Sequence, residues 1–223
     1  MTPAAEFNHY TCAYSAARLY ALTSPNPSST LPPSYSGFVL PPDWSPPNQL
    51  KLTLLPLDIT TKHLLPEQEL FGVIAPLTEA GSPLASWCGH FLAVTYQKMQ
   101  ELYRETGPDE QYRPQDVDLS LHDPMCVYYV LTRNEADGDG SDGWQFWKGR
   151  DIRVEAAGQW TRGMCVVDRR TRRMAGEEDE LVLGDAHGWL HPSLGNRINQ
   201  VVESPDGAEN SVAGWLITRV FGC

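Results

Sequence analysis

The sequence predicts an α/β fold with a mostly parallel, three-layer (Rossmann-like) sheet. Three observations carry this prediction. Segments that suit strands alternate with segments that suit helices along the chain. One strand segment is apolar throughout, as in a sheet that is buried on both faces. The composition is that of a globular protein, with 41% hydrophobic and 20% charged residues, so the 223 residues are expected to form a single domain around one core.

The first part of the chain predicts a helix, a long connection and a strand. Residues 13–22 predict a short helix with an apolar side of alanine, leucine and tyrosine. Residues 24–48 are rich in proline and serine, which cannot continue a helix or a central strand, so this stretch is interpreted as an inserted loop. Residues 51–57 are rich in leucine and predict a strand buried on both faces of a parallel sheet.

The rest of the chain continues the alternation. A long helix is predicted from Ser82-Pro83 to Gly107-Pro108, because apolar residues recur there at three- and four-residue steps. The recurring residues are Leu84, Cys88, Phe91, Leu92, Thr95, Met99 and Leu102. Residues 151–157 and 164–167 predict two strands that glycines punctuate. Residues 199–202 predict a further strand, and residues 208–221 predict a closing helix.

A histidine and an aspartate stand side by side where another helix is predicted to begin. Asp123 suits the N-cap and Pro124 suits the first helical position, while the apolar run 125–131 is interpreted as a core helix. A carboxylate held at a helix end suits a metal ligand. His122, one residue outside the helix, could reach a substrate bound at the same cation. The alternative is a capped helix beside a solvated histidine.

Four segments carry strings that occur together in one enzyme family. They are Thr2–Asn8 with Ala-Glu-Phe-Asn, Leu55–Thr60, the His122-Asp123-Pro124 element, and Val154–Asp168 with Thr-Arg-Gly-Met-x-Val-Val-Asp. In this order they resemble the inosine-uridine-preferring nucleoside hydrolase family. The resemblance implies that family's α/β fold and hydrolysis of the N-glycosidic bond of a ribonucleoside, which yields ribose and a free base. It also implies a calcium ion that grips the ribose hydroxyls and a water molecule.

The resemblance assigns roles to four residues. Asp123 would be a calcium ligand, and His122 would face the leaving base and assist its protonation. Glu6 and Asn8 would hydrogen-bond the ribose hydroxyls, where a carboxylate also stabilises positive charge that develops on the sugar. Because Glu6 and Asn8 lie close to the terminus, a frayed segment is the alternative for them.

Other residues of these strings favour structural roles. Asp58 and Thr60 stand at the end of a predicted strand, where a loop or cap role is favoured over catalysis. Arg162 and Asp168 are interpreted as pairing or turn residues. The family opens the helix after Ala-Glu-Phe-Asn with an Asp-Pro pair, and Ala13-Tyr14 stands there in this chain. The proline-rich insertion and the acidic loop also lengthen connections, and neither touches the four assigned residues directly.

A motif of the family is absent from the sequence. Members begin with a strand followed by Asp-x-Asp-x-Gly-x-Asp-Asp, which supplies most calcium ligands and the general base, and the 223 residues contain no such cluster. The acidic stretch 134–143 is not that cluster, because its third aspartate comes one position early and no apolar strand leads into it, so it is interpreted as a surface loop. An EF-hand also fails there, since Lys148 stands at the twelfth position counted from Asp137.

The chain therefore resembles an N-terminally truncated, C-terminal portion of such an enzyme. Activity of this chain alone is not expected. Two alternatives stay open beside the nucleosidase. One is a catalytically inactive remnant or interaction protein that keeps the fold, and the other is an incomplete gene model of an active enzyme.

The net charge and the cysteine pattern limit which partners and which cellular compartment the sequence predicts. A net charge of −11 argues against a nucleic-acid partner, which requires a basic surface, and leaves a small nucleoside and a homo-oligomer as expectations. The start of the chain lacks a basic segment followed by an apolar one. No apolar run approaches the about 20 residues that span a bilayer, so neither secretion nor membrane insertion is expected. Five cysteines without a Cys-x-x-Cys pair indicate reduced thiols in the cytoplasm rather than a zinc site or a disulfide framework.

Overall fold

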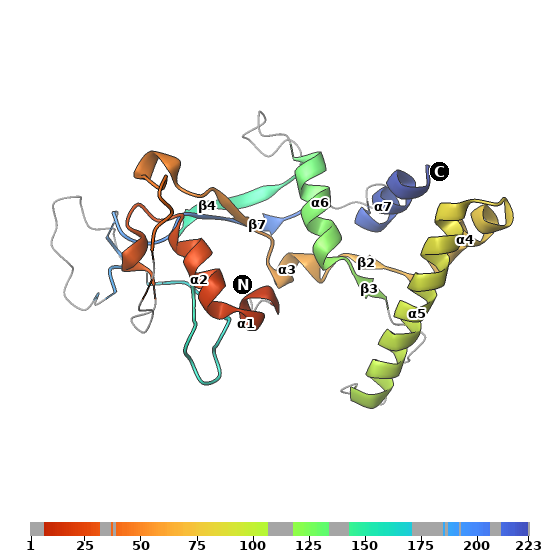
Figure 1. Cartoon of the computed structure of the whole chain (residues 1–223), viewed down its shortest axis with the longest axis horizontal. Coiled ribbons are helices and arrows are strands. Elements are labelled where there is room, and N and C mark those ends of the chain that lie inside the picture. Colours follow the sequence, from red (N-terminus) through yellow and green to blue (C-terminus); the bar gives the residue numbers. More distant parts are fainter. Residues whose placement is uncertain are drawn as a thin grey trace. The chain divides into compact units, whose positions relative to one another are not determined.

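The computed structural model of the chain consists of two compact units, each described by itself (Figure 1). Unit 1 comprises Met1–Leu57 and Gln145–Glu203, and unit 2 comprises Asp58–Trp144 and Ser204–Cys223. Both units contain helices and strands, so the chain is an α/β protein. The structure describes residues 7–31, 37, 39–106, 118–133, 143–170, 185, 187–191, 193–205 and 211–222.

A mixed three-stranded sheet is the main sheet of unit 1. Its central strand, β7 (Ile198–Glu203), pairs in parallel with β1 (Leu52–Leu54) and antiparallel with β4 (Gln145–Arg150). A separate antiparallel pair joins β5 (Arg153–Val154) to β6 (Cys165–Val166). The described strands of unit 1 thus form a mixed sheet and a separate antiparallel pair, where the sequence predicts one mostly parallel, three-layer sheet.

The difference has a physical reason in the connections. Neighbouring parallel strands need a long crossover, which is usually a helix, whereas antiparallel strands do not. In the described part of the stretch from Gln145 to Glu203 no helix intervenes between successive strands. Helices lie between β1 and its parallel partner β7 in the chain, as the alternation of strands and helices predicts. Between β4 and β7 the described residues contain no helix, and these two strands are antiparallel.

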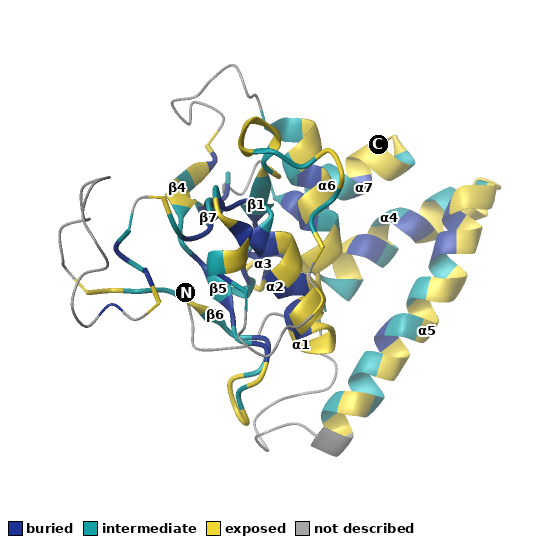
Figure 2. Ribbon diagram, turned by 60° about the vertical axis from the view of Figure 1, so that its left-hand side comes forward, coloured by how far each residue is buried: buried dark blue, intermediate teal, exposed yellow. Residues whose placement is uncertain are grey.

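Helix α2 covers the core of unit 1. It runs from Ala13 to Ala21 and confirms the helix predicted at residues 13–22. Its small alanines let it approach the strands closely, and it buries one face because its apolar residues recur at helical spacing. The core that it joins contains Ala13, Ala16, Ala17, Tyr20, Leu54, Ile152, Val154, Ala156 and Ile198 (dark blue in Figure 2).

Short elements flank α2 on both sides. Helix α1 (Phe7–Thr11) precedes it. The proline- and serine-rich stretch 24–48 contains two single turns, η1 (Pro27–Ser29) and η2 (Pro46–Asn48), in its described part. That part has no strand and no longer helix, as the interpretation of an inserted loop expects. Of the predicted acidic loop 134–143, only Gly143 lies among the described residues.

Helices dominate unit 2. A short antiparallel pair joins β2 (Leu64–Leu65) to β3 (Leu119–Ser120). Trp144 is fully buried, and its indole ring packs against the rings of Tyr128 and Tyr129 in α6. The indole N–H donates to Thr132 Oγ1 at 3.1 Å. The described helices of this unit are α3 (Leu57–Thr60), α4 (Glu67–Glu79), α5 (Pro83–Thr106), α6 (His122–Thr132) and α7 (Val212–Phe221).

Helix α5 confirms the predicted helix and, in part, its buried face. Of the predicted apolar residues Cys88 is buried, together with Ala85 and Tyr96, whereas Leu84 and Phe91 are each 45% exposed. The buried side lies against α4, and Gly89 permits the approach because a Cβ there would lie 2.9 Å from Ile74 Cγ2. The sequence pattern contains two apolar stripes, and α4, which the sequence analysis did not predict, covers one of them.

Helix α6 begins earlier than predicted and is not a core helix. Its N-cap is Leu121, so Asp123 is the second helical residue rather than the cap. The reason is that Leu121 is buried and its N–H donates to His63 O at 2.9 Å, which fixes the backbone two residues before the predicted N-cap. Val130 is 72% exposed, because a run of consecutive apolar residues cannot all face one side of a helix. In the described ranges no helix is both long and apolar enough to cross a membrane.

Candidate functional site

The start of α6 brings two of the family-like strings together within unit 2. Thr60, the last residue of α3, places its Oγ1 2.8 Å from Nδ1 of His122, the first residue of α6. These residues are 62 positions apart in the sequence. The pairing of Leu64 with Ser120 in β2 and β3 holds the two segments side by side just beyond this contact. His122 therefore has a fixed ring although the residue is exposed.

The chemistry of this contact suits a residue that exchanges a proton. A hydroxyl can accept a hydrogen bond, and an imidazolium that gives up its Nε2 proton keeps the hydrogen on Nδ1, so Thr60 can accept from Nδ1–H both before and after the transfer. A carboxylate partner would instead favour the charged ring. The contact uses Nδ1 and leaves Nε2 for a second partner. The pair can thus deliver a proton from Nε2 while the ring keeps its orientation.

Asp123 follows His122 and is exposed in the first turn of α6. A carboxylate there is favoured by the partial positive charge at the helix N-terminus. Calcium, however, takes about six to eight oxygen ligands. The described residues contain no group of three or more histidine, cysteine, aspartate or glutamate side chains placed to hold a metal ion. On its own, Asp123 does not fit the calcium site that the resemblance implies.

A second pair of family-like strings meets within unit 1. Asn8 is exposed on α1, and Glu6 lies outside the described residues. The segment Thr161–Met164 packs on the same helix, because Arg162 Nη1 donates to Tyr10 O at 2.6 Å. Its neighbour Gly163 has φ +84°, and a Cβ there would lie 2.6 Å from Tyr10 Cα. The close approach of Gly163 thus positions the helix that carries Asn8.

His9 connects the same two strings and was not recognised in the sequence. It is buried, with Nε2 3.3 Å from Tyr20 Oη and Nδ1 3.4 Å from Cys165 Sγ. Its ring meets Tyr20 edge-to-face, with centroids 5.2 Å apart. Burial lowers the pKa of His9 below its ordinary value of 6.5, since the charged ring is poorly solvated there. Only its position directly after Asn8 could have suggested a role.

The buried His9 makes a prediction for stability. Because its pKa is lower in the folded chain, the unfolded chain binds more protons at pH values between the two. The contribution of His9 to the free energy of unfolding should therefore be complete above about pH 6.5, the pKa of an unfolded histidine. It should be lost as the pH falls through the lower pKa of the folded chain. Urea titrations from pH 7.5 to pH 5 test this, with His9→Gln as the comparison. A decline of the same size in His9→Gln would assign the effect to other groups.

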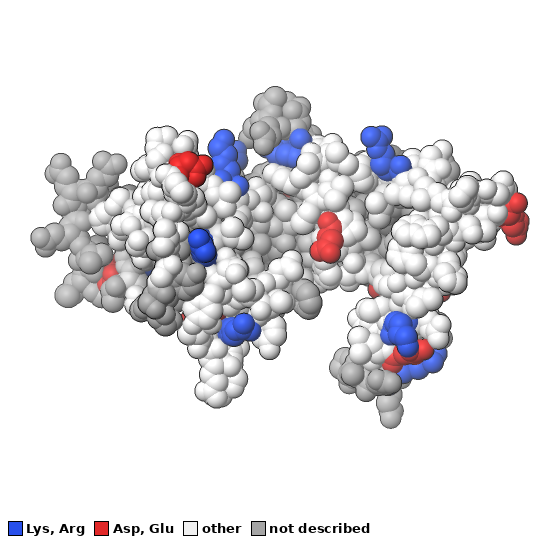
Figure 3. All heavy atoms as spheres, viewed as in Figure 1, with Lys and Arg blue, Asp and Glu red and all other residues white. Residues whose placement is uncertain are grey.

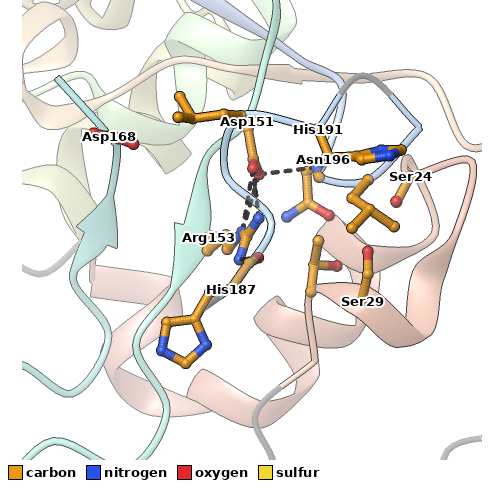
Figure 4. Close-up of polar contacts among 12 residues, drawn as sticks. Ser24, Ser29, Asp151, Arg153, Asp168, His187, His191 and Asn196 are labelled. Carbon is orange, nitrogen blue, oxygen red and sulfur yellow. Dashed lines mark hydrogen bonds and ion pairs between the residues drawn. The ribbon is translucent and has the colours of Figure 1, made fainter. Parts of the chain in front are cut away.

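The remaining polar network of unit 1 is structural. Arg153 Nη2 lies 2.8 Å from Asp151 Oδ2, and the N–H of Asn196 donates to Asp151 Oδ1 at 2.9 Å (Figure 4). The guanidinium of Arg153 also stacks 3.8 Å above the ring of Trp189. The charges of Arg153 and Asp151 thus neutralise each other, and the stacking holds the loop around Trp189 against β5. The ring of His191 contacts Ser193 instead and takes no part in the ion pair.

The two residues interpreted as structural in the last string make such contacts. Arg162 donates to a backbone carbonyl, as described above. Asp168 accepts from Arg170, which also bridges to Asp185 Oδ1 at 2.9 Å. Burial acts to raise the pKa of Asp185, but hydrogen bonds from Leu190 N–H and Arg170 outweigh it and lower the pKa.

The predicted site residues are distributed over both units. Asn8 belongs to unit 1, whereas His122 and Asp123 are adjacent in unit 2. Thr60 joins His122 by a contact that the sequence did not reveal, while Asp58 lies in the first turn of α3.

Comparison with known proteins identifies one family. The family model described as inosine-uridine preferring nucleoside hydrolase matches residues 1–187. This range includes all four segments in which the sequence resembles that family. No curated protein and no solved structure matches the chain.

Proposed function

The chain belongs to the inosine-uridine preferring nucleoside hydrolase family, and from this premise we propose that it binds ribonucleosides and takes part in hydrolysis of their N-glycosidic bond. The observation that carries the proposal is the 2.8 Å contact between Thr60 Oγ1 and His122 Nδ1. It joins two of the family-like strings and orients the exposed imidazole of His122, the residue that precedes Asp123 in α6. This arrangement suits proton delivery to a departing base.

In the proposed reaction a water oxygen forms a bond to C1′ of the ribose while the bond from C1′ to the base nitrogen breaks. The base nitrogen keeps the bonding electron pair and takes a proton from Nε2 of His122. Thr60 holds the ring before and after the transfer, and His122 regains a proton from solvent. Glu6 and Asn8 remain the proposed ribose ligands, as the family resemblance implies.

Water activation has no proposed residue in this chain. The attacking water must lose a proton to a base, and the aspartate cluster that does this in the family is absent from the sequence. We propose that a second polypeptide segment supplies these carboxylates. The same segment would complete the calcium site, to which Asp123 would add one ligand, and we assign no step of the reaction to the metal.

Nucleoside binding by the purified chain tests the proposal. Saturation-transfer NMR with inosine and with uridine should detect binding of both, weakened in His122→Ala. Thr60→Val should weaken it in the same direction, because it removes the hydroxyl and keeps the shape, while Thr60→Ser should not. Failure to bind either nucleoside would contradict the proposal and favour the inactive remnant or interaction protein.

Ribose release provides the complementary measurement. Without a water-activating segment, the chain should release reducing sugar from inosine and uridine at no useful rate, since residues of one catalytic site act as a unit. Rapid calcium-dependent release that Asp123→Ala abolishes would refute this expectation. In that case another carboxylate of this chain would be the base, with Asp58 the first candidate.

Calcium binding is expected to be weak. With Asp123 as the proposed ligand and no group of three or more histidine, cysteine, aspartate or glutamate side chains placed to hold a metal among the described residues, calorimetric titration should give a Kd no lower than about 1 mM. Asp123→Ala should remove the remaining signal. Tight binding that persists in Asp123→Ala would show that the metal is held elsewhere.

We also propose a cytoplasmic location and a nucleoside rather than a nucleic acid as the partner. The support for the location is the state of the cysteines, since thiols stay reduced in the cytoplasm. Four of them are described, and all four are free thiols: Cys12, Cys88, Cys126 and Cys165.

A further inference from the structure

An open hollow lies beside β4 in unit 1. Its volume is about 540 Å³, and it is lined by Phe146, Trp147, Lys148 and Arg150. In the described part of the sheet, β4 is an outer strand, because it pairs with β7 and with no other strand. A hollow of this volume is large enough for a small ligand. None of the residues that line it has a role in the proposed function.

A bulge in β4 brings an aromatic and a charged side chain together. Trp147 pairs with Gln200 and Arg150 with Ile198, so three steps along β4 match two steps along β7. The extra residue is accommodated at Gly149, where φ is +61°. Without the bulge, side chains three residues apart would point to opposite faces of the sheet. With it, Arg150 Cζ lies 4.4 Å from the centroid of the Trp147 ring.

Arg150 is held in place without an acidic partner. Its Nη1 donates to Gln200 Oε1 at 3.1 Å, and its guanidinium covers one face of the Trp147 indole. Within the described residues, no carboxylate forms an ion pair with Arg150 or with Arg169. Burial lowers the pKa of Arg150, and the nearby charge of Arg169 lowers it further. A bound anion would relieve the repulsion between these two guanidinium groups.

A group of cations without acidic partners is a local feature of this chain. Acidic residues outnumber basic ones by 28 to 17. Figure 3 shows charged side chains scattered singly or in small groups over the face in view, with uncharged surface between them. Lys148, Arg150 and Arg169 beside one exposed ring therefore indicate a site for an anion. The net negative charge repels a long polyanion, so the anion that fits is a small one.

We propose that the hollow beside β4 binds a nucleoside monophosphate. Trp147 is 49% exposed, so the indole surface that Arg150 does not cover can stack on a base. The phosphate is held by Arg150, Arg169 and Lys148, because guanidinium groups bind phosphate oxygens through paired hydrogen bonds. The ring thus recognises the planar base and the cations recognise the phosphate. A ligand that lacks either part uses only half of the site.

Calorimetric titration with AMP tests the site. The hollow is open and leaves part of the ligand in water, so we expect a Kd of about 0.1 mM. Trp147→Ala and Arg169→Gln should each raise this Kd at least roughly 10-fold, since the first removes the stacking and the second a charged hydrogen bond. The matched controls are Trp160→Ala, at a residue that is 87% exposed and outside β4, and Arg104→Gln in α5. Both controls should leave the Kd unchanged.

The same titrations in His122→Ala separate this site from the proposed nucleoside site. The inference does not depend on the proposed function, because β4 belongs to unit 1 and His122 to unit 2. The Kd for AMP should therefore be unchanged in His122→Ala. In that variant, adenosine and inorganic phosphate should each bind at least roughly 10-fold more weakly than AMP, because each lacks one of the two recognised parts.

Three results would overturn the inference. The first is a chain that does not bind AMP. The second is AMP binding that His122→Ala abolishes and Arg169→Gln leaves unchanged, which would place the nucleotide at the nucleoside site. The third is adenosine or phosphate binding as tightly as AMP in His122→Ala. Arg169 is exposed, so Arg169→Gln decides the case if Trp147→Ala loses its circular dichroism.

Discussion

His122→Ala is expected to lower the rate of inosine hydrolysis by roughly 10²–10⁴-fold, the usual range for loss of a general acid. The measurement is ribose release by the chain once a second polypeptide supplies the water-activating carboxylates. The expected loss is large because the base of inosine leaves poorly as an anion. The contact with Thr60 orients the ring of His122 for this transfer.

A substrate with a good leaving group separates proton delivery from positioning. 4-Nitrophenyl riboside releases a stable anion that needs little protonation, so His122→Ala should slow its hydrolysis much less. Thr60→Val is the matched variant, because it keeps the imidazole and loses only the hydroxyl that holds it. An equal loss with inosine and with the nitrophenyl riboside would assign His122 to positioning alone.

Gly163→Ala is expected to lower the free energy of unfolding of the chain by about 2–4 kcal/mol. Two effects add at this position. The backbone has φ +84°, where an alanine is strained, and the new Cβ would lie 2.6 Å from both the N and the Cα of Tyr10. Backbone atoms cannot move aside as a side chain can, so α1 itself must shift.

Gly149→Ala supplies the control for Gly163→Ala. Gly149 belongs to the same unit and has φ +61°, but the nearest atom to its added Cβ is the Arg197 Cδ at 4.0 Å. This variant should therefore cost only the backbone strain, about 1 kcal/mol. Urea unfolding of both variants gives the comparison. A loss at Gly163 no larger than at Gly149 would show that α1 adjusts freely to the added methyl group.

The helices and strands that could be predicted are those whose pattern is local. Helix α2 and helix α5 appear nearly at their predicted ends, since apolar spacing and proline or glycine boundaries determine them. Strand β4 was not predicted, because Gln145–Arg150 mixes charged and aromatic residues and is stabilised by pairing with β7. That partner lies some fifty residues away, and no local pattern encodes it.

In the candidate site too, local features could be predicted and contacts between distant segments could not. His122 and Asp123 could be located from their own tripeptide and the family-like strings, and they do stand at the start of a helix. The identity of the N-cap could not, because Leu121 is fixed by His63, a residue of another segment. The partner of the His122 ring was equally hidden, since Thr60 reaches it only through the fold. The sequence thus locates reactive groups better than the contacts that orient them.

Each unit of this chain is assembled from two separate stretches, so the backbone passes from one unit to the other three times. Strand β1, near the start, finds its parallel partner in β7, near the end. Removing the start of the chain up to the first unit boundary would therefore leave β7 without β1, whereas removing the end from Ser204 onward would take α7 from unit 2. Deletion series will not yield an isolated unit, and a linker that joins Leu57 directly to Gln145 is the route to expressing unit 1 by itself.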